Sequence, residues 1–242
     1  MPLLQKTTNR LPAHSRKQGI VETVLELVAA HGTESVSAQL VADAIGVTQP
    51  AVFRHFPTKE AMWLAVMDWL EERLVAIYST ANDDTDEPGL IVLSRMFLGH
   101  VKLIADYPAL SKLVFSDHLR LQYPSLQVRF ERIHKAYTAR LSAVIERAKS
   151  DGTVYRSLVS KDAATMFLCL LQGLGFQFAI ARLPMKLFPE AQRIFAIYLQ
   201  GIAAPADAGK RARGTLETAK NSLRRQTSHV TDSQPTASSP AT

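Results

Sequence analysis

Two short amphipathic segments joined by a glycine turn constrain the fold of this chain more than any other feature of its sequence. Apolar residues recur at helical spacing in the first segment, where Ser37 is placed to cap the helix. In the second segment, Thr48 can cap and Pro50 stands in the first turn, where a missing N–H costs nothing. Gly46 occupies the turn between them. The pattern predicts a helix-turn-helix, which presents its second helix to the major groove of DNA.

The residues after the turn distinguish this pattern from the helical hairpin of any compact domain. Residues 49–56 read QPAVFRHF and residues 57–60 read PTKE, an order that resembles the signature of the TetR family of transcriptional regulators. The resemblance spans residues 16–74. It implies a three-helix DNA-binding domain at the N-terminus, followed by a helical domain for ligand binding and dimerisation.

The rest of the sequence holds further helical patterns, and no strand-like alternation is longer than four residues, so we predict an all-α fold. Helices are expected over residues 16–31, 58–80, 90–106, 109–121, 125–149, 160–181 and 187–202, in addition to the helix-turn-helix. The expected domains are a flexible basic arm (1–15), a helix-turn-helix DNA-binding domain (16–60), a helical regulatory and dimerisation domain (61–203) and a disordered tail (204–242).

Composition indicates the compartment and the class of partner. The chain has 242 residues and a net charge of +6, which suits an anionic partner. Cys169 is the single cysteine, so a disulfide framework is excluded and a cytoplasmic, nucleoid-associated protein is expected. The tail is poor in large apolar residues and is either an inert extension or a weak, non-specific binder of nucleic acid.

An uncharged stretch over residues 163–181 is the most apolar part of the sequence. Three environments fit such a stretch: a subunit interface, an internal core, or a membrane. Gln172 and Gln177 interrupt it and no second span accompanies it, which argues against a membrane. The resemblance implies that the last two helices, at about residues 160–202, form a homodimer interface.

Double-stranded DNA is the partner that the helix-turn-helix predicts, and side-chain chemistry divides its residues into two groups. The side chains suited to base edges are those of Gln49, Pro50, Ala51 and Arg54. Arg54 could also bind a phosphate. Groups suited to backbone phosphate stand at Ser37, Thr48, His55, Thr58 and Lys59. One helix of about 12 Å reaches only about three or four base pairs, so we expect a homodimer on a near-palindromic operator.

Phe53 departs from the family pattern. The resemblance implies a Tyr at this position, whose hydroxyl reaches a phosphate, whereas Phe offers only ring contact. Either each subunit loses one phosphate bond here, or Phe53 is mainly a packing residue. Phe53 is kept in the predicted DNA-binding set.

The resemblance also implies a pocket for a small-molecule effector among the C-terminal helices, while no metal or cofactor is expected. The sequence does not identify the effector. The candidate lining residues are Met96, Phe97, His100, Phe115, His118, His134, Tyr137, Phe167 and Phe176. Aromatic and Met residues at helical spacing are more often part of a packed core, and both interpretations stay open at this point.

Catalysis is not expected, because Cys169 lies in an apolar stretch and the sequence has no HxxxH, CxxC or Gly-rich phosphate motif. The predicted function is that of a DNA-binding transcriptional regulator, specifically a ligand-responsive repressor. The alternative is a protein with the same DNA-binding fold that acts in chromosome organisation or cell-division control. The RHFP run at residues 54–57 also occurs in such relatives.

Overall fold

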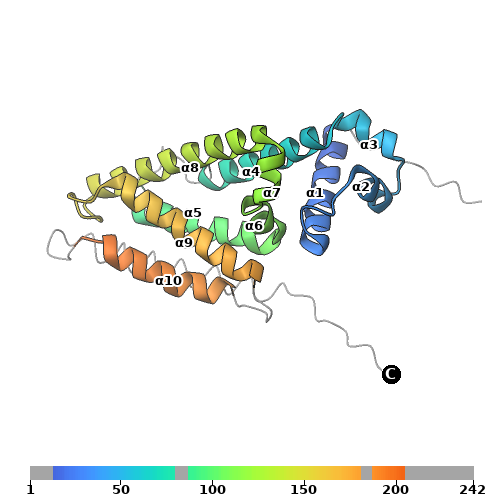
Figure 1. Ribbon diagram of the computed structural model, residues 1–242. Helices are drawn as coiled ribbons and strands as arrows, with labels where there is room; N and C mark the ends of the chain where they lie inside the picture. Colours follow the sequence, from blue (N-terminus) through green and yellow to red (C-terminus); the bar gives the residue numbers. More distant parts are fainter. Residues whose placement is uncertain (1–12, 80–86, 181–186, 205–242) are drawn as a thin grey trace, which may run out of the picture. The chain divides into compact units, whose positions relative to one another are not determined.

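A computed structural model describes residues 13–79, 87–180 and 187–204 (Figure 1). These residues form ten helices and no strand, which confirms the all-α prediction for them. The one β-type pairing among them is an isolated antiparallel bridge between Val154 and Ala203. The predicted tail beyond residue 204 and residues 1–12 of the predicted basic arm lie outside the described residues.

The helices follow the predicted ranges closely, with one break that the sequence analysis did not predict. They are α1 (Ala13–His31), α2 (Ala38–Ile45), α3 (Gln49–His55), α4 (Lys59–Ser79), α5 (Gly89–Asp106), α6 (Ala109–Val114), α7 (Asp117–Gln122), α8 (Pro124–Ser150), α9 (Ser160–Ile180) and α10 (Leu187–Ile202). The single helix expected over residues 109–121 is wrong. The Ser116 side chain accepts a hydrogen bond from the Leu119 N–H at 3.3 Å, and this cap starts α7 as a separate helix.

The described residues form two compact units. Unit 1 comprises residues 13–71 and 112–130, and unit 2 comprises residues 72–111, 131–180 and 187–204 without the undescribed residues 80–86. The helix-turn-helix therefore shares its unit with the later segment that contains α7. The functional division predicted at residue 60 stays a prediction.

Unit 1 has a small aliphatic and aromatic core, in which α2 packs against both α1 and α3. Val24, Val41, Val52 and Trp63, from four successive helices, are at most 1% exposed. Burying one such aliphatic side chain stabilises a fold by about 1.5–3 kcal/mol. This core fixes the angle between the two helices of the helix-turn-helix.

Unit 2 has a core of stacked aromatic rings, to which α5, α9 and α10 contribute. These three helices pack against one another within the unit. The Phe97 ring stacks on Phe195 with centroids 4.0 Å apart, and Phe167 meets Phe97 edge-on at 5.4 Å. Tyr198 stacks on Phe195 at 5.4 Å and donates a hydrogen bond to the Ala163 carbonyl at 3.0 Å. Such ring pairs contribute about 0.5–1.5 kcal/mol beyond the area they bury.

Helix α9 is the one helix of the described residues that is long and apolar enough to cross a membrane, by length and composition only. Within unit 2, one side of α9 is part of the aromatic core through Phe167 and Leu171. The core helices of globular proteins meet the same criterion. The buried side of α9 therefore has a packing role that needs no lipid.

Candidate nucleic-acid interface

Helix α2 is held at both ends by local hydrogen bonds that the sequence specifies. Ser37 accepts a hydrogen bond from the Leu40 N–H at 3.1 Å, as its predicted cap position requires. At the other end, Gly46 has φ +69°, in the left-handed region where a side chain is strained. The Val47 N–H then bonds to the Ala42 carbonyl at 3.0 Å and closes the turn. These bonds set the point at which α3 begins.

Helix α3 turns one face into the core of unit 1 and leaves the rest accessible. Val52 is 1% exposed, and Phe56 is buried just after the helix ends. Pro50, Phe53 and Arg54 are exposed. Because successive helical residues are 100° apart, burying Val52 turns these three side chains away from the core.

The residue before α3 does not cap it through its side chain. Thr48 has extended backbone angles, and its carbonyl accepts a hydrogen bond from the Ala51 N–H at 2.9 Å. Its hydroxyl makes no capping bond. Of the two roles considered for Thr48, capping is therefore excluded and donation to a phosphate stays a prediction.

The start of α4 supplies the remaining predicted phosphate contacts. Thr58 is exposed and accepts a hydrogen bond from the Ala61 N–H at 3.0 Å, which uses one of the first-turn donors. Lys59 is half-buried, like His55 at the end of α3. The positive end of the α4 dipole and the Lys59 ammonium both favour an anion at this position.

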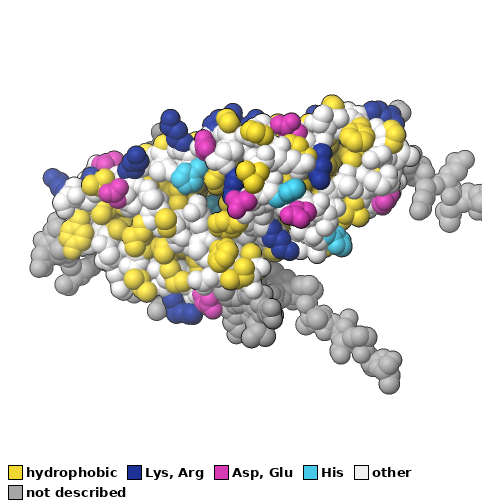
Figure 2. Space-filling view, viewed as in Figure 1, with side chains coloured by type: hydrophobic (Ala, Val, Ile, Leu, Met, Phe, Trp, Pro, Cys, Tyr) yellow, Lys and Arg dark blue, Asp and Glu magenta, His cyan; other side chains and the backbone are white. Residues whose placement is uncertain are grey.

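All ten residues predicted to contact DNA lie in unit 1, and none of them is buried. The exposed ones are Ser37, Thr48, Pro50, Phe53, Arg54 and Thr58, and the half-buried ones are Gln49, Ala51, His55 and Lys59. They lie at the start of α2, along α3 and at the start of α4. Figure 2 shows Lys and Arg side chains at the α3 end of this unit. Phe53 is 39% exposed, so its ring is only partly used in packing.

The later segment of unit 1 binds directly to α1 and to α4. Lys112 donates to the Ala29 carbonyl in the last turn of α1 at 2.6 Å. Ser125 donates to Glu60, and Arg129 forms ion pairs with Asp68 and Glu71, the latter at 3.7 Å. These contacts fix α1 and α4 to the segment that follows α5 in the chain.

This supporting role was not predicted from the sequence. Lys112, Ser125 and Arg129 carry it through the contacts above, and none of them belongs to a recognisable motif. The Ser116–Asp117 pair is a helix-start signal, because Ser caps and an acidic residue favours the first turn. That signal could have identified the break between α6 and α7.

The nine residues predicted to line an effector pocket are divided between the two units. Met96, Phe97, Tyr137 and Phe167 are buried in unit 2, and His100 is half-buried there. His134 and Phe176 are exposed in unit 2, whereas Phe115 and His118 are exposed in unit 1. Phe97 and Phe167 are fully used in the stacked aromatic core. An effector site among these residues stays a prediction.

His100 and Tyr137 form a polar pair inside unit 2. His100 Nδ1 lies 3.3 Å from the Tyr137 hydroxyl, and the Tyr78 ring stacks on Tyr137 with centroids 5.9 Å apart. Burial lowers the pKa of His100 from 6.5 to about 4, so the imidazole is neutral at neutral pH. Burial also raises the pKa of the Tyr137 hydroxyl well above its ordinary value.

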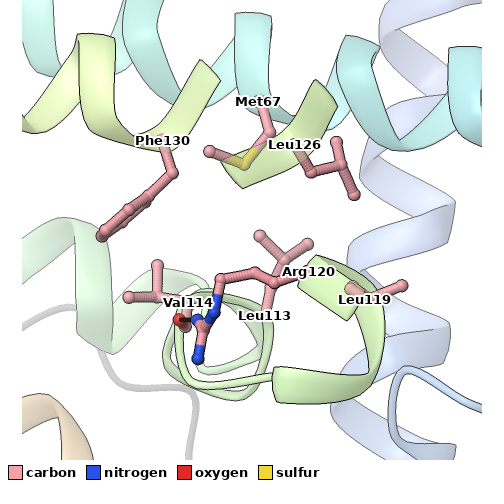
Figure 3. A pocket seen from close by; sticks show the side chains of 7 residues that line it. All are labelled: Met67, Leu113, Val114, Leu119, Arg120, Leu126 and Phe130. Atoms are coloured by element: carbon pink, nitrogen blue, oxygen red, sulfur yellow. Dashed lines mark hydrogen bonds between the residues drawn. The ribbon is translucent and has the colours of Figure 1, made fainter. Parts of the chain in front are cut away.

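A hollow is present in unit 1, on the side of α4 that faces α6 and α7 (Figure 3). It is open to solvent, and the space within it, solvent included, is about 280 Å³. It is lined by Met67, Leu113, Val114, Leu119, Arg120, Leu126 and Phe130. Figure 3 shows Met67 and Leu126 on one side and Leu113, Val114 and the Arg120 stem on the other. None of the nine predicted pocket residues lines it.

The outer sides of α9 and α10 carry large apolar side chains that the unit leaves uncovered. Met166 is 53% exposed, Ile180 61% and Ile197 69%. A Cβ added at Gly173, on the same side of α9, would meet open space. Figure 2 shows hydrophobic side chains gathered over these two helices.

The sequence of this chain is similar to those of known DNA-binding regulators. A family model described as bacterial regulatory proteins of the tetR family matches residues 20–66, which contain the helix-turn-helix. The nucleoid occlusion factor SlmA of Marinobacter nauticus is 26% identical over 193 residues, which cover 76% of this chain and 94% of the relative. SlmA of Klebsiella pneumoniae is 25% identical over 170 residues, covering 68% and 83% of the two chains.

Solved structures with low sequence identity share the fold. The fatty acid degradation regulator FadR from Bacillus halodurans superposes with a TM-score of 0.65 at 20% identity, over 76% of this chain and 94% of that one. A TetR transcription regulator from Haloarcula marismortui gives a TM-score of 0.67 at 18% identity, over 79% and 100%. At these identities the similarity concerns the arrangement of helices alone.

Proposed function

Because this chain belongs to the TetR family of DNA-binding transcriptional regulators, we propose that it is a ligand-responsive repressor that binds a near-palindromic operator as a homodimer. The observation that carries the proposal is the arrangement of α3. Its core face is buried through Val52, while residues suited to base edges and phosphates stand on its accessible side.

Within the proposed interface, two kinds of contact have separate tasks. Gln49, Pro50, Ala51 and Arg54 read base edges: Gln49 pairs with adenine, Arg54 pairs with guanine, and the two small residues contact a thymine methyl. Ser37, Thr48, His55, Thr58 and Lys59 bind phosphates and fix the register of the helix on the duplex. Phe53 adds ring contact to the backbone.

Two copies are needed for such a short reading helix to be specific. Seven residues at 1.5 Å each give α3 a length of about 10 Å, enough for about three or four base pairs. Each correct pair discriminates by about 1–3 kcal/mol, which is too little for one half-site to stand out in a genome. A two-fold dimer doubles the number of pairs that are read.

The proposed dimer uses the outer sides of α9 and α10, at about residues 160–202. Met166, Ile180 and Ile197 supply the apolar area, and Gly173 permits a close approach of two backbones. Effector binding would favour a dimer whose reading helices are wrongly spaced for DNA. The shift can be no larger than the ligand's differential affinity for the two states.

A second candidate function is supported by the names of the curated relatives. Two that cover most of this chain are called nucleoid occlusion factors, which suits a role in chromosome organisation or cell-division control. Such a protein would be cytoplasmic and bound to the nucleoid. It would use the same α3 interface at many sites away from promoters.

Mapping of bound sites across the genome of the source organism tests both candidates. A repressor is expected at one or a few promoters, with a two-fold symmetric sequence under each peak. Many scattered sites with no regulated neighbour would favour the second function. The absence of any enriched symmetric sequence would contradict both.

A further inference from the structure

The positive charge of this chain is concentrated in one short segment outside the helix-turn-helix. Residues 210–225, the basic segment, contain one acidic residue, Glu217, and six basic ones: Lys210, Arg211, Arg213, Lys220, Arg224 and Arg225. The net charge of this segment is +5 and that of the whole chain is +6, so all other residues together carry only +1. Such a run of basic residues is typical of arms that bind nucleic acid.

The unit that contains the reading helix lacks an excess of positive charge. Residues 13–71 and 112–130, the described part of unit 1, contain seven Lys and Arg residues and eight Asp and Glu residues, a net charge of −1. Three of the seven cations are already bonded within the unit: Lys112, Arg120 and Arg129. Duplex DNA carries about one negative charge per 1.7 Å of its axis. The described part of unit 1 therefore exerts little long-range attraction on this polyanion.

The basic segment is joined to unit 2 at a defined point. Ala204 is the last described residue, and its N–H donates to the Thr153 carbonyl at 3.0 Å. A second backbone hydrogen bond, of 3.2 Å, runs from the Tyr155 N–H to the Ile202 carbonyl. Lys210 follows Ala204 by six positions. Because the segment is covalently attached here, its binding to a duplex that α3 already holds is an intramolecular event.

We infer that the basic segment is a second DNA-binding site, which contacts the phosphates of a duplex bound through α3. Its cations release counterions from the duplex and so add affinity that falls with rising salt. Phosphate contacts carry no base information, so the segment raises the affinity for every sequence by a similar factor. The inference goes beyond the proposed function, because it supplies affinity without specificity and applies equally to a repressor and to a nucleoid-bound protein.

Binding of the full-length protein to a duplex of random sequence tests the second site without any operator. Fluorescence anisotropy at several salt concentrations gives the slope of log K against log salt concentration. The test variant combines six substitutions: Lys210→Gln, Arg211→Gln, Arg213→Gln, Lys220→Gln, Arg224→Gln and Arg225→Gln. Each phosphate contact contributes about 0.9 to the slope, so its magnitude should fall by at least about 2 in this variant. The affinity at about 0.1 M salt should fall at least about tenfold.

Two triple variants with the same loss of charge separate the segment from the net charge of the protein. One removes three charges from the basic segment: Lys220→Gln, Arg224→Gln and Arg225→Gln. The other removes three exposed charges from unit 2: Lys135→Gln, Arg156→Gln and Lys161→Gln. Only the first should reduce the salt slope, by at least about 1. Circular dichroism verifies that all variants keep their helices.

A shuffled order of residues 210–225 keeps the charge of the segment and changes its sequence. It should bind like the wild type, because phosphates attract cations in any order. The second site is wrong if the six-Gln variant loses less than about 2 of the slope, if both triple variants lower it equally, or if the shuffled segment loses affinity. A gain in DNA affinity on neutralisation would also contradict it, because the segment would then compete with DNA for acidic groups of the protein.

Operator duplexes distinguish failure of this inference from failure of the proposed function. The six-Gln variant should lose a similar factor on operator and random duplexes, so the ratio of the two affinities stays that of the wild type. A loss confined to the operator would contradict the role of the basic segment as a phosphate-binding site. A wild type that binds random DNA as tightly as the operator would contradict the proposed function alone.

Discussion

Thr33 and Ser116, 83 positions apart in the sequence, share a buried hydrogen bond of 3.1 Å between their side-chain oxygens. Ser116 also accepts the Leu119 N–H and so starts α7, while Thr33 lies in the turn that precedes α2. The two hydroxyls thus join the turn that leads into the helix-turn-helix to a segment 83 residues further along the chain. This relationship explains why both segments belong to unit 1.

Removal of the Thr33 hydroxyl should destabilise unit 1 by a measurable amount. Thr33→Val deletes one hydrogen bond and leaves the Ser116 cap, so the free energy of unfolding should fall by about 1 kcal/mol. Ser116→Ala deletes the bond and the cap together and should cost about 2 kcal/mol. Urea denaturation gives both values. Thr138→Val, at an exposed hydroxyl of α8, is the control and should change little. Equal stability of the two Thr variants would contradict this account.

Gly46 and Gly19 make a matched pair for the turn of the helix-turn-helix. A Cβ at either residue would meet open space, but only Gly46 has a left-handed backbone, with φ +69°. Gly46→Ala should therefore destabilise by about 1 kcal/mol through strain alone. Gly19→Ala, inside α1, should stabilise by up to about 1 kcal/mol through helix propensity. Thermal unfolding of the two variants should shift in opposite directions, and a shift in the same direction would show that the Gly46 turn is unstrained.

The proposed dimer interface can be broken by charge on the outer side of α9 or α10. Met166→Glu and Ile197→Glu each place a carboxylate in an apolar interface, where it would be desolvated without a partner. Light scattering at micromolar concentration should show monomers for both and a dimer for the wild type. Leu121→Glu is the control, since Leu121 is 83% exposed in unit 1. A monomeric wild type, or dimeric variants, would exclude this interface.

The lowered pKa of the half-buried His100 imidazole predicts a dependence of stability on pH. Its pKa is about 4 in the folded protein and about 6.5 in the unfolded chain, so the unfolded state binds the proton more readily. Stability is therefore fully retained above pH 6.5 and is lost as the pH falls from 6.5 to about 4. The slope that His100 contributes there is about 1.4 kcal/mol per pH unit.

His100→Gln keeps a group that can bond to the Tyr137 hydroxyl but does not titrate. Denaturation midpoints of this variant and the wild type, measured between pH 4 and 7, should therefore diverge. The variant curve is expected to be flatter below pH 6.5. Parallel curves would mean that His100 is accessible to protons in the folded state.

Helices with both a periodic apolar face and a terminal signal could be predicted from the sequence. Ser37 caps α2 as expected, and α10 spans the predicted residues 187–202. The split between α6 and α7 could not be found from periodicity, because apolar residues continue across Ser116. Apolar character alone does not identify the buried positions of the helix-turn-helix: Val41 and Val52 are buried, whereas Val47 is 42% exposed.

The lining of the predicted effector pocket could not be assigned from the sequence. Phe97 and Phe167 have the spacing of pocket residues, yet stacking at 4.0–5.4 Å fills the space between α5, α9 and α10. The hollow of unit 1 is lined instead by Met67 of α4 and by side chains of the three consecutive helices α6, α7 and α8. Whether aromatic rings pack together or line a cavity depends on tertiary distances, and no sequence pattern encodes these.

Binding to DNA duplexes with single base-pair changes tests the central claim, that α3 reads bases. The half-site comes from the genomic map, and fluorescence anisotropy gives the affinity of the full-length dimer for each duplex. Gln49→Ala and Arg54→Ala should each relax the preference at one position by about 1–3 kcal/mol. Lys59→Ala should weaken binding to all duplexes by a similar factor, because a phosphate contact carries no base preference. Gln122→Ala is the control and should leave binding unchanged, because Gln122 is exposed at the end of α7, outside the proposed interface. Unaltered base preference in both the Gln49 and Arg54 variants would contradict the assignment of α3 as the reading helix.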